Sequence, residues 1–102
     1  MYYRFTSDIT RLGPILTPYV LEIDDNYVRY SKRNRNLLNK DKISIPIDII
    51  SSIDIDSSLL GTTLIITGYG MATIKIKKLN IQDAYAIQEI LNNRRSELVK
   101  TR

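Results

Sequence analysis

Isoleucine recurs at every second position in the middle of the chain, with small or charged residues between. The first run has it at positions 43, 45 and 47, and the second at positions 53 and 55. A period of two sends one set of side chains to a core and the other to water, so both runs predict half-buried β-strands. Pro46 has no N–H to donate and predicts a sheet edge, a bulge or a strand end. Residues Asp48 to Ile50 predict a corner between the two strands.

Two segments before these runs predict a hairpin. Apolar and polar residues alternate from Tyr19 to Asp24, and the pattern returns from Tyr27 to Arg33 with Val28 and Tyr30 on the inner face. The residues between them, Asp24-Asp25-Asn26, cap their own backbone and tolerate left-handed conformations, which is typical of a turn.

A second hairpin follows the isoleucine strands. The segment from Thr62 to Thr67 predicts one strand, and the segment from Met71 to Lys78 predicts its partner, with Lys75 and Lys77 on the outer face. Gly68-Tyr69-Gly70 joins them, and glycine adopts positive φ angles without a steric penalty.

Less regular segments precede these strands. Residues Met1 to Thr10 allow a first strand, which Gly13-Pro14 would end. The polar and basic segment from Asn34 to Asp41 predicts a loop.

After Leu79 the spacing of apolar residues changes from two to about 3.6, which predicts an amphipathic helix from Ile81 to Val99. Asn80 is a favourable N-cap, and Asp83 lies in the first turn, where a negative charge stabilises the helix dipole. The apolar face of this helix consists of Ala84, Ile87, Leu91 and Leu98.

These elements predict a mainly β (α+β) fold in a single domain, residues 1–102. Six or seven antiparallel strands, within about residues 2–78, must curl into a barrel or sandwich to cover their edges, and the helix can cover an open end. We expect Ile53, Ile55, Ile74 and Ile87 to be buried.

Part of the sequence resembles a known family. The segment from Ile43 to Ile55 reads ISIPIDIISSIDI, the segment from Leu59 to Thr67 reads LLGTTLIIT, and a helix begins near Asp83-Ala84. Together they resemble the bacterial pleckstrin-homology-like (PH-like) domain family over about residues Tyr19 to Asn92. The resemblance implies a PH-like fold and a non-catalytic binding or assembly role. Relatives are often attached to membrane helices, whereas no apolar run of this chain is long enough to span a bilayer.

The amino-acid composition limits the reactions that the chain could catalyse. The chain has no cysteine and no histidine, so disulfides, thiol chemistry, and the commonest general base and transition-metal ligand are missing. We therefore expect no enzyme activity, no cofactor and no small-molecule substrate. The N-terminus lacks the apolar core of a signal peptide, which predicts a cytoplasmic location.

The best candidate for a binding site is a basic stretch. Between Tyr27 and Lys42 six basic residues face one acidic residue, a local charge of +5 in a chain of net charge +4. The six are Arg29, Lys32, Arg33, Arg35, Lys40 and Lys42. If the strand continues past Tyr30, Arg29, Arg33 and Arg35 share an outward face and could hold phosphate by bidentate hydrogen bonds.

A solvated strand face and loop explains the same residues without a site. The acidic residues Glu22, Asp24 and Asp25 lie on the partner strand and turn of the same hairpin, where they would partly cancel the field. The loop that binds phosphoinositides in eukaryotic PH domains is basic, whereas the corresponding segments here are acidic or nearly uncharged.

Other residues give weaker signals. Asp48, Asp54 and Asp56 could bind a divalent metal, but alternating aspartates opposite buried isoleucines are more simply a solvated strand face. The tyrosines could stack on bases, although only Tyr27 and Tyr30 lie beside the basic stretch.

The sequence therefore predicts a non-catalytic module that acts through protein contacts or self-association, in which an isoleucine-rich sheet edge favours a closed symmetric oligomer. The alternative is a weak anion-binding module that docks on acidic membrane or nucleic acid through the basic stretch.

Overall fold

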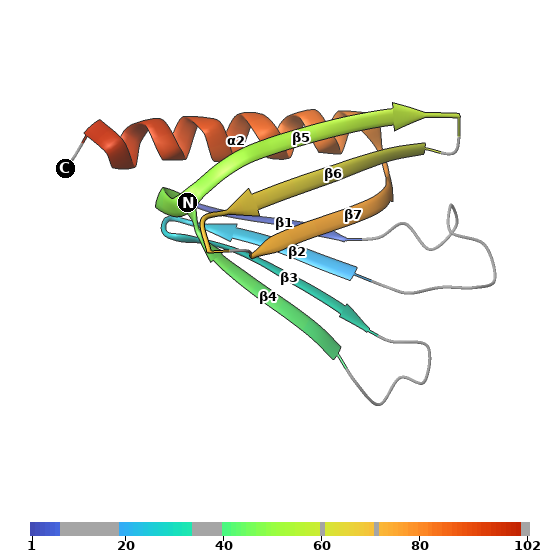
Figure 1. Cartoon of the computed structure of the whole chain (residues 1–102), viewed down its shortest axis with the longest axis horizontal. Coiled ribbons are helices and arrows are strands. Elements are labelled where there is room, and N and C mark those ends of the chain that lie inside the picture. Colours follow the sequence, from blue (N-terminus) through green and yellow to red (C-terminus); the bar gives the residue numbers. More distant parts are fainter. Residues whose placement is uncertain (7–18, 34–39, 60, 71, 101–102) are drawn as a thin grey trace.

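The computed structural model describes residues 1–6, 19–33, 40–59, 61–70 and 72–100, which form two antiparallel sheets and one long helix (Figure 1). In sheet A the order is β1 (Tyr2–Thr6), β2 (Tyr19–Asp24), β3 (Tyr27–Arg33) and β4 (Lys40–Pro46). In sheet B it is β5 (Ile50–Ser58), β6 (Gly61–Gly68) and β7 (Thr73–Leu79). A short 3-10 helix, η1 (Ile47–Ile49), joins the sheets, and α2 (Ile81–Lys100) follows them.

The predicted fold class is confirmed, because the described chain is mainly β with seven antiparallel strands and a C-terminal helix. The strands form two separate sheets, so the architecture is the sandwich and not a closed barrel. One boundary was predicted wrongly. Lys40 and Asp41 belong to β4 and not to a loop, because they pair with Arg33 and Lys32 of β3. The predicted break at Gly13-Pro14 and the rest of the predicted loop lie outside the described residues.

Both sheets and the helix contribute to one core. Its fully buried side chains include Leu21 and Ile45 from sheet A, Ile74 from sheet B, and Ile87 from α2. The predicted burial of Ile74 and Ile87 is thus confirmed.

Ile53 and Ile55 are only partly buried, in contrast to the prediction. Their strand, β5, is an edge strand of sheet B, and α2 contacts it. The Gln88 side chain donates a hydrogen bond from Nε2 to the Ile53 carbonyl oxygen at 3.2 Å. The helix therefore covers this edge (Figure 1), while the isoleucines retain some exposure.

The two sheets meet closely at the predicted corner. Pro46 is the last residue of β4, as its missing N–H suggests, and the Ile47 N–H donates to the Asn26 carbonyl at 2.9 Å. A Cβ atom added at Gly68, the buried last residue of β6, would lie 3.0 Å from Ile45 Cγ2. Only glycine leaves the two sheets this close without displacing a core side chain.

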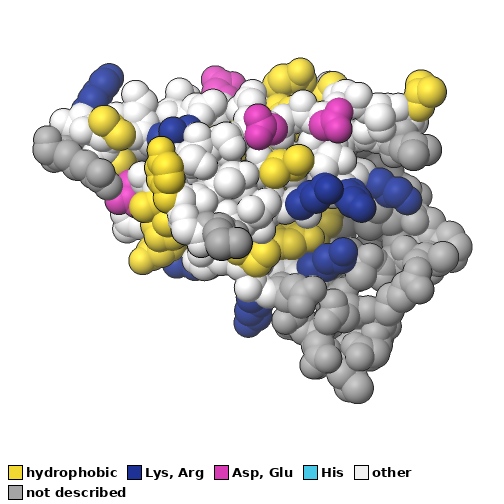
Figure 2. All heavy atoms as spheres, in the orientation of Figure 1, with side chains coloured by type: hydrophobic (Ala, Val, Ile, Leu, Met, Phe, Trp, Pro, Cys, Tyr) yellow, Lys and Arg dark blue, Asp and Glu magenta, His cyan; other side chains and the backbone are white. Residues whose placement is uncertain are grey.

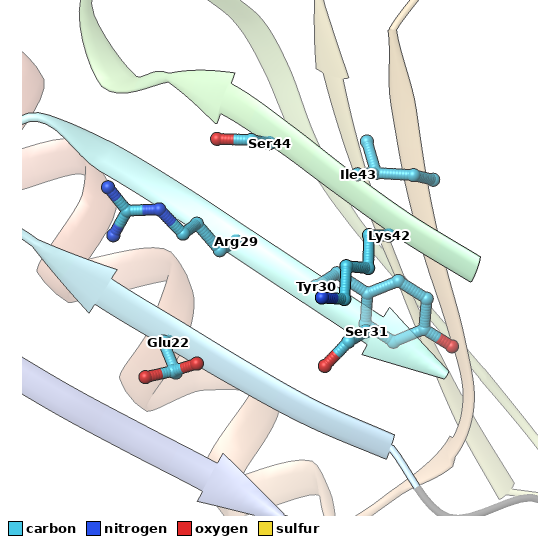
Figure 3. Close-up of a pocket in the computed structure, with 7 residues that line it drawn as sticks. All are labelled: Glu22, Arg29, Tyr30, Ser31, Lys42, Ile43 and Ser44. Atoms are coloured by element: carbon cyan, nitrogen blue, oxygen red, sulfur yellow. The ribbon is translucent and has the colours of Figure 1, made fainter. Parts of the chain in front are cut away.

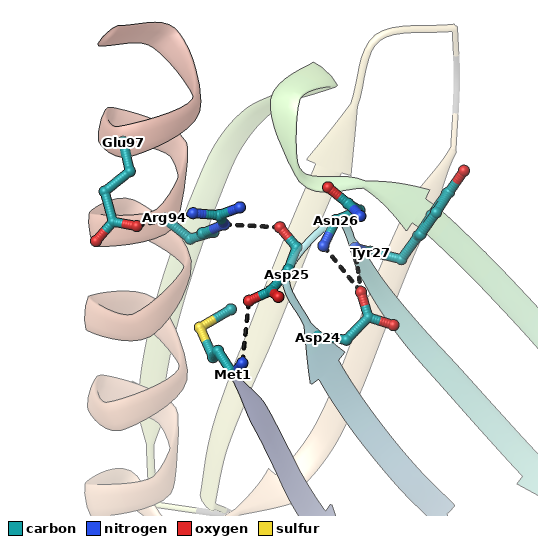
Figure 4. A network of polar contacts seen from close by, with 7 residues as sticks. All are labelled: Met1, Asp24, Asp25, Asn26, Tyr27, Arg94 and Glu97. Carbon is teal, nitrogen blue, oxygen red and sulfur yellow. Dashed lines mark hydrogen bonds and ion pairs between the residues drawn. The ribbon is translucent and has the colours of Figure 1, made fainter. Parts of the chain in front are cut away.

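The helix begins as predicted, because the Asn80 side chain accepts a hydrogen bond from the Gln82 N–H at 2.8 Å. Near its other end, Arg94 Nε donates to the Asp25 carbonyl oxygen at 2.7 Å, and the N-terminal amine lies 3.1 Å from the Asp25 carboxylate (Figure 4). The turn between β2 and β3 is thus fastened to both the helix and the N-terminus. No helix in the described part of the chain has the length and apolar character needed to cross a bilayer.

Candidate functional site

The outer face of sheet A, which points away from the core, carries the candidate site. Strand pairing places Glu22, Arg29 and Ser44 in one row across β2, β3 and β4, and places Ser31 beside Lys42 in the next row. A pocket of about 350 Å³ lies over these rows (Figure 3). It is lined by Glu22, Arg29, Tyr30, Ser31, Lys42, Ile43 and Ser44. Tyr30 is buried on the core side, so the polar side chains of the lining belong to the outer face.

The structure describes the side chains of three of the six predicted basic residues, and these do not share one face. Arg29 and Lys42 line the pocket and are exposed. Lys32 pairs with Tyr19, which is buried, and strand alternation places both on the opposite face of the sheet. The predicted site is therefore divided between the two faces.

The other three residues of the predicted site lie at or beyond the end of the hairpin. Arg33 pairs with Lys40 through the backbone at the last position of β3. Their side chains, and all of Arg35, lie outside the described residues. Whether they extend the pocket stays a prediction.

Arg29 is already engaged with neighbours on its own face. Its guanidinium forms an ion pair with the Asp24 carboxylate and lies 5.0 Å from the centre of the Tyr27 ring. This ion pair is the charge cancellation expected from the acidic residues of the hairpin. An arginine that must leave a carboxylate and an aromatic ring is a weaker ligand for phosphate.

Asp24 is stabilised in its charged form by several donors. Its Oδ1 accepts hydrogen bonds from the N–H groups of Asn26 at 2.9 Å and Tyr27 at 2.8 Å. Burial acts to raise the pKa of Asp24, but these two bonds and the Arg29 guanidinium outweigh it and hold the pKa below its usual value of 3.8. The carboxylate that neutralises Arg29 is thus ionised at neutral pH.

The second carboxylate of this face is also engaged. The Tyr2 hydroxyl donates a hydrogen bond to Glu22, and this bond is the main reason why the pKa of Tyr2 is raised. Lys42, by contrast, is exposed and forms no ion pair within the described chain. The pocket can therefore offer one ammonium group, with the Ser31 hydroxyl beside it, to a single carboxylate or phosphate.

A second pocket, of about 440 Å³, lies where the β2–β3 turn, η1 and the end of α2 meet. Its lining is Asn26, Tyr27, Pro46, Asp48, Ile49 and Leu98. No sequence signal could have grouped these residues, because they come from separate elements. In the described ranges no three His, Cys, Asp or Glu side chains lie close enough to hold a metal ion.

The chain was also compared with known proteins. No family model, no curated protein and no solved structure matches it. The resemblance to PH-like domains accordingly stays a prediction.

Proposed function

We propose that the chain is a non-catalytic, PH-like binding or assembly module that acts through protein–protein contacts or self-association. The observation that carries this proposal is the edge of sheet A. Among the described strands β4 is the last of its sheet and pairs with β3 alone, so the other side of its backbone can accept a further strand. The pocket on the outer face lies beside this edge.

An extended polypeptide segment fits this edge. It would add backbone hydrogen bonds to β4, while its alternate side chains would reach the pocket, where Lys42 would pair with an acidic side chain. Pro46 ends the strand and limits the added segment to about the seven residues of β4.

The composition of the pocket argues for binding over catalysis. Among the described residues of its lining Glu22 is the single carboxylate, and its oxygen is hydrogen-bonded to Tyr2. General acid–base chemistry on a substrate usually needs a second group of matched pKa within reach, and the chain contains no histidine or cysteine to supply it.

Photo-crosslinking tests the edge directly. A photoreactive amino acid at Ser44, which is exposed on β4, should give discrete adducts with one partner or with a second copy in a lysate of the source cells. Charged side chains on an edge oppose strand pairing, so Ser44→Lys should abolish binding of the isolated partner. Asn92→Lys, on the exposed side of α2, is the matched control and should bind normally. Binding that is equally strong in both variants would exclude the β4 edge.

The alternative is a weak anion-binding module that docks on acidic membrane or nucleic acid through the basic stretch. It is favoured by Lys42, which is exposed beside Ser31. If three to five cations contact duplex DNA, the logarithm of the affinity should fall with the logarithm of salt with a slope of roughly −3 to −4. We expect little binding to anionic vesicles or DNA at physiological salt, because Arg29 is paired with Asp24. Tight binding under those conditions would favour the alternative.

A further inference from the structure

The outer face of sheet B separates its charges by strand. Pairing places Asp54 of β5, Ile65 of β6 and Lys75 of β7 in one row. In the next row Asp56 lies opposite Thr63, and on the other side of Thr63 a register shift between the Thr62–Leu79 and Leu64–Ile76 pairs leaves both Lys77 and Lys78 facing it. Figure 2 shows acidic side chains over β5, basic side chains over β7 and an apolar side chain between them. The face therefore has an acidic edge and a basic edge on either side of a less polar centre.

These charges do not satisfy one another within the molecule. The acidic and basic columns are two strand spacings apart, about 10 Å. All four charged side chains are exposed, and none takes part in an ion pair within the described chain. Ile65 between them is partly buried but does not belong to the core cluster.

We propose that this face binds the same face of a second copy of the chain. The twofold axis of the dimer would lie between the two sheets and run parallel to β6. Rotation about that axis exchanges the two columns. Asp54 then lies opposite the partner's Lys75, Asp56 opposite the partner's Lys77, and Ile65 against the partner's Ile65. A twofold axis across the strands would instead oppose aspartate to aspartate and lysine to lysine. The charge pattern thus selects one of the two symmetric ways of stacking the sheets.

The edges of sheet B are poorly suited to pairing, which leaves the face. The β5 edge is covered by α2 through the bond between Gln88 and the Ile53 carbonyl. On β7 a register shift opposite Thr63 inserts Lys78, whose φ is 59°, and this bulge adds an exposed lysine to Lys75 and Lys77. Lysines and bulges oppose strand addition, and two β7 edges would bring these lysines together. Of the two isoleucine-rich edges, the β5 edge is therefore poorly placed to drive self-association, whereas the β4 edge is separate from this face.

The size of the face makes the association weak. Three strands at about 4.8 Å spacing and eight residues at about 3.3 Å give a footprint of roughly 380 Å² per copy. Stable complexes bury about 800 Å² per partner, so we expect a dissociation constant in the micromolar to millimolar range. Exposed ion pairs supply the specificity, and salt screens them.

This inference rests on the self-association arm of the proposed function, and charge reversal tests it separately. The first variant is Asp54→Lys with Asp56→Lys, whose face is wholly basic. The second is Lys75→Asp with Lys77→Asp, whose face is wholly acidic. In sedimentation at about 0.02 M salt, where screening is weak, each variant alone should self-associate at least about tenfold more weakly than the natural chain.

An equimolar mixture of the two variants should form a heterodimer and so recover the association of the natural homodimer, because every charge again meets its opposite. All four substitutions in one chain should restore the homodimer with reversed polarity. The control Glu89→Lys with Glu97→Lys, on the exposed side of α2, changes net charge as the first variant does and should leave association unchanged. Circular dichroism would check that each variant is folded.

Two results would overturn the proposal: self-association of the single-sign variants equal to that of the natural chain, or a mixture that stays monomeric. Neither result would contradict the proposed role of the β4 edge, because the Ser44→Lys variant tests that edge independently. Conversely, loss of the β4 interaction would not affect a heterodimer formed through sheet B.

Discussion

The outer faces of the two sheets both carry acidic and basic side chains but arrange them differently. On sheet A opposite charges lie close together, so Arg29 pairs with Asp24 only five residues away. On sheet B an entire strand, β6, separates Asp54 and Asp56 from Lys75 and Lys77. A tight hairpin therefore neutralises its own charges, whereas a three-stranded meander can leave them available to another molecule.

The difference changes which part of the sequence looks functional. The basic stretch is the strongest compositional signal in the chain, but the fold divides it and pairs its best-placed arginine with Asp24. The alternating charges of β5 and β7 look like ordinary solvated strand faces in the sequence. They acquire a pattern only when the strands are placed side by side.

Both sheets contribute to one core and should unfold together, which core substitutions can test. Ile45→Ala in β4 and Ile74→Ala in β7 each remove a fully buried side chain. Each should lower the free energy of unfolding by roughly 2–5 kcal/mol. Urea denaturation followed by circular dichroism and by tyrosine fluorescence should give one coincident transition for each variant. Ile65→Ala on the outer face should have a much smaller effect. Two separate transitions would show that the sheets unfold independently.

The close approach of the sheets should be sensitive to added volume. In Gly68→Val a side chain must enter the space where a Cβ lies 3.0 Å from Ile45 Cγ2, so we expect a loss of about 1–3 kcal/mol. Thr67→Val, one residue earlier and partly exposed, is the matched control and should change stability by no more than about 0.5 kcal/mol. Equal stability of the two variants would mean that the corner can open freely.

Local rules were sufficient to predict most of the fold from the sequence. Period-two alternation predicted the β2–β3 and β6–β7 hairpins, and the Asn80 cap predicted the helix start. A strand end was one of the placements expected for Pro46, which is the last residue of β4. These signals act over a few residues, and each is satisfied by contacts within its own element or with the next one. The degree of burial of Ile53 and Ile55 could not be predicted this way, because it depends on where α2 lies against β5.

The candidate surfaces were less predictable for the same reason. Alternation places Arg29 and Lys32 on opposite faces of a strand, provided that no bulge interrupts it between them. Alternation does not show which strands are neighbours in a sheet. The Arg29–Asp24 pair could be anticipated because it lies within one hairpin. The alignment of Asp54 with Lys75 could not, because it depends on the pairing of β5, β6 and β7.

Replacing one aspartate on each outer face should change the free energy of unfolding by different amounts. Asp24→Ala removes an ion pair and the acceptor of two backbone N–H groups, so we expect a loss of about 1 kcal/mol in urea denaturation. Asp54→Ala removes a side chain without an ion-pair partner in the described chain and should change the stability of the monomer by less than about 0.5 kcal/mol. Equal losses of stability in the two variants would show that the Asp24 contacts stabilise the folded chain no more than Asp54 does.

The smallest expected effect is the pH dependence that Asp24 gives to sheet A. Its pKa in the folded state lies below the usual value of 3.8, so the unfolded chain binds a proton at Asp24 more readily than the folded chain does. The stabilisation is therefore fully present above about pH 5 and is lost as the pH falls through the folded-state pKa. The stability difference between the natural chain and Asp24→Asn should narrow over that acidic range. Between about pH 6 and 8 stability should be flat, because the chain has no histidine and, apart from its amino terminus, no group whose ordinary pKa lies there. A difference between the natural chain and Asp24→Asn that persists unchanged into strong acid would show that the Asp24 charge does not stabilise the hairpin.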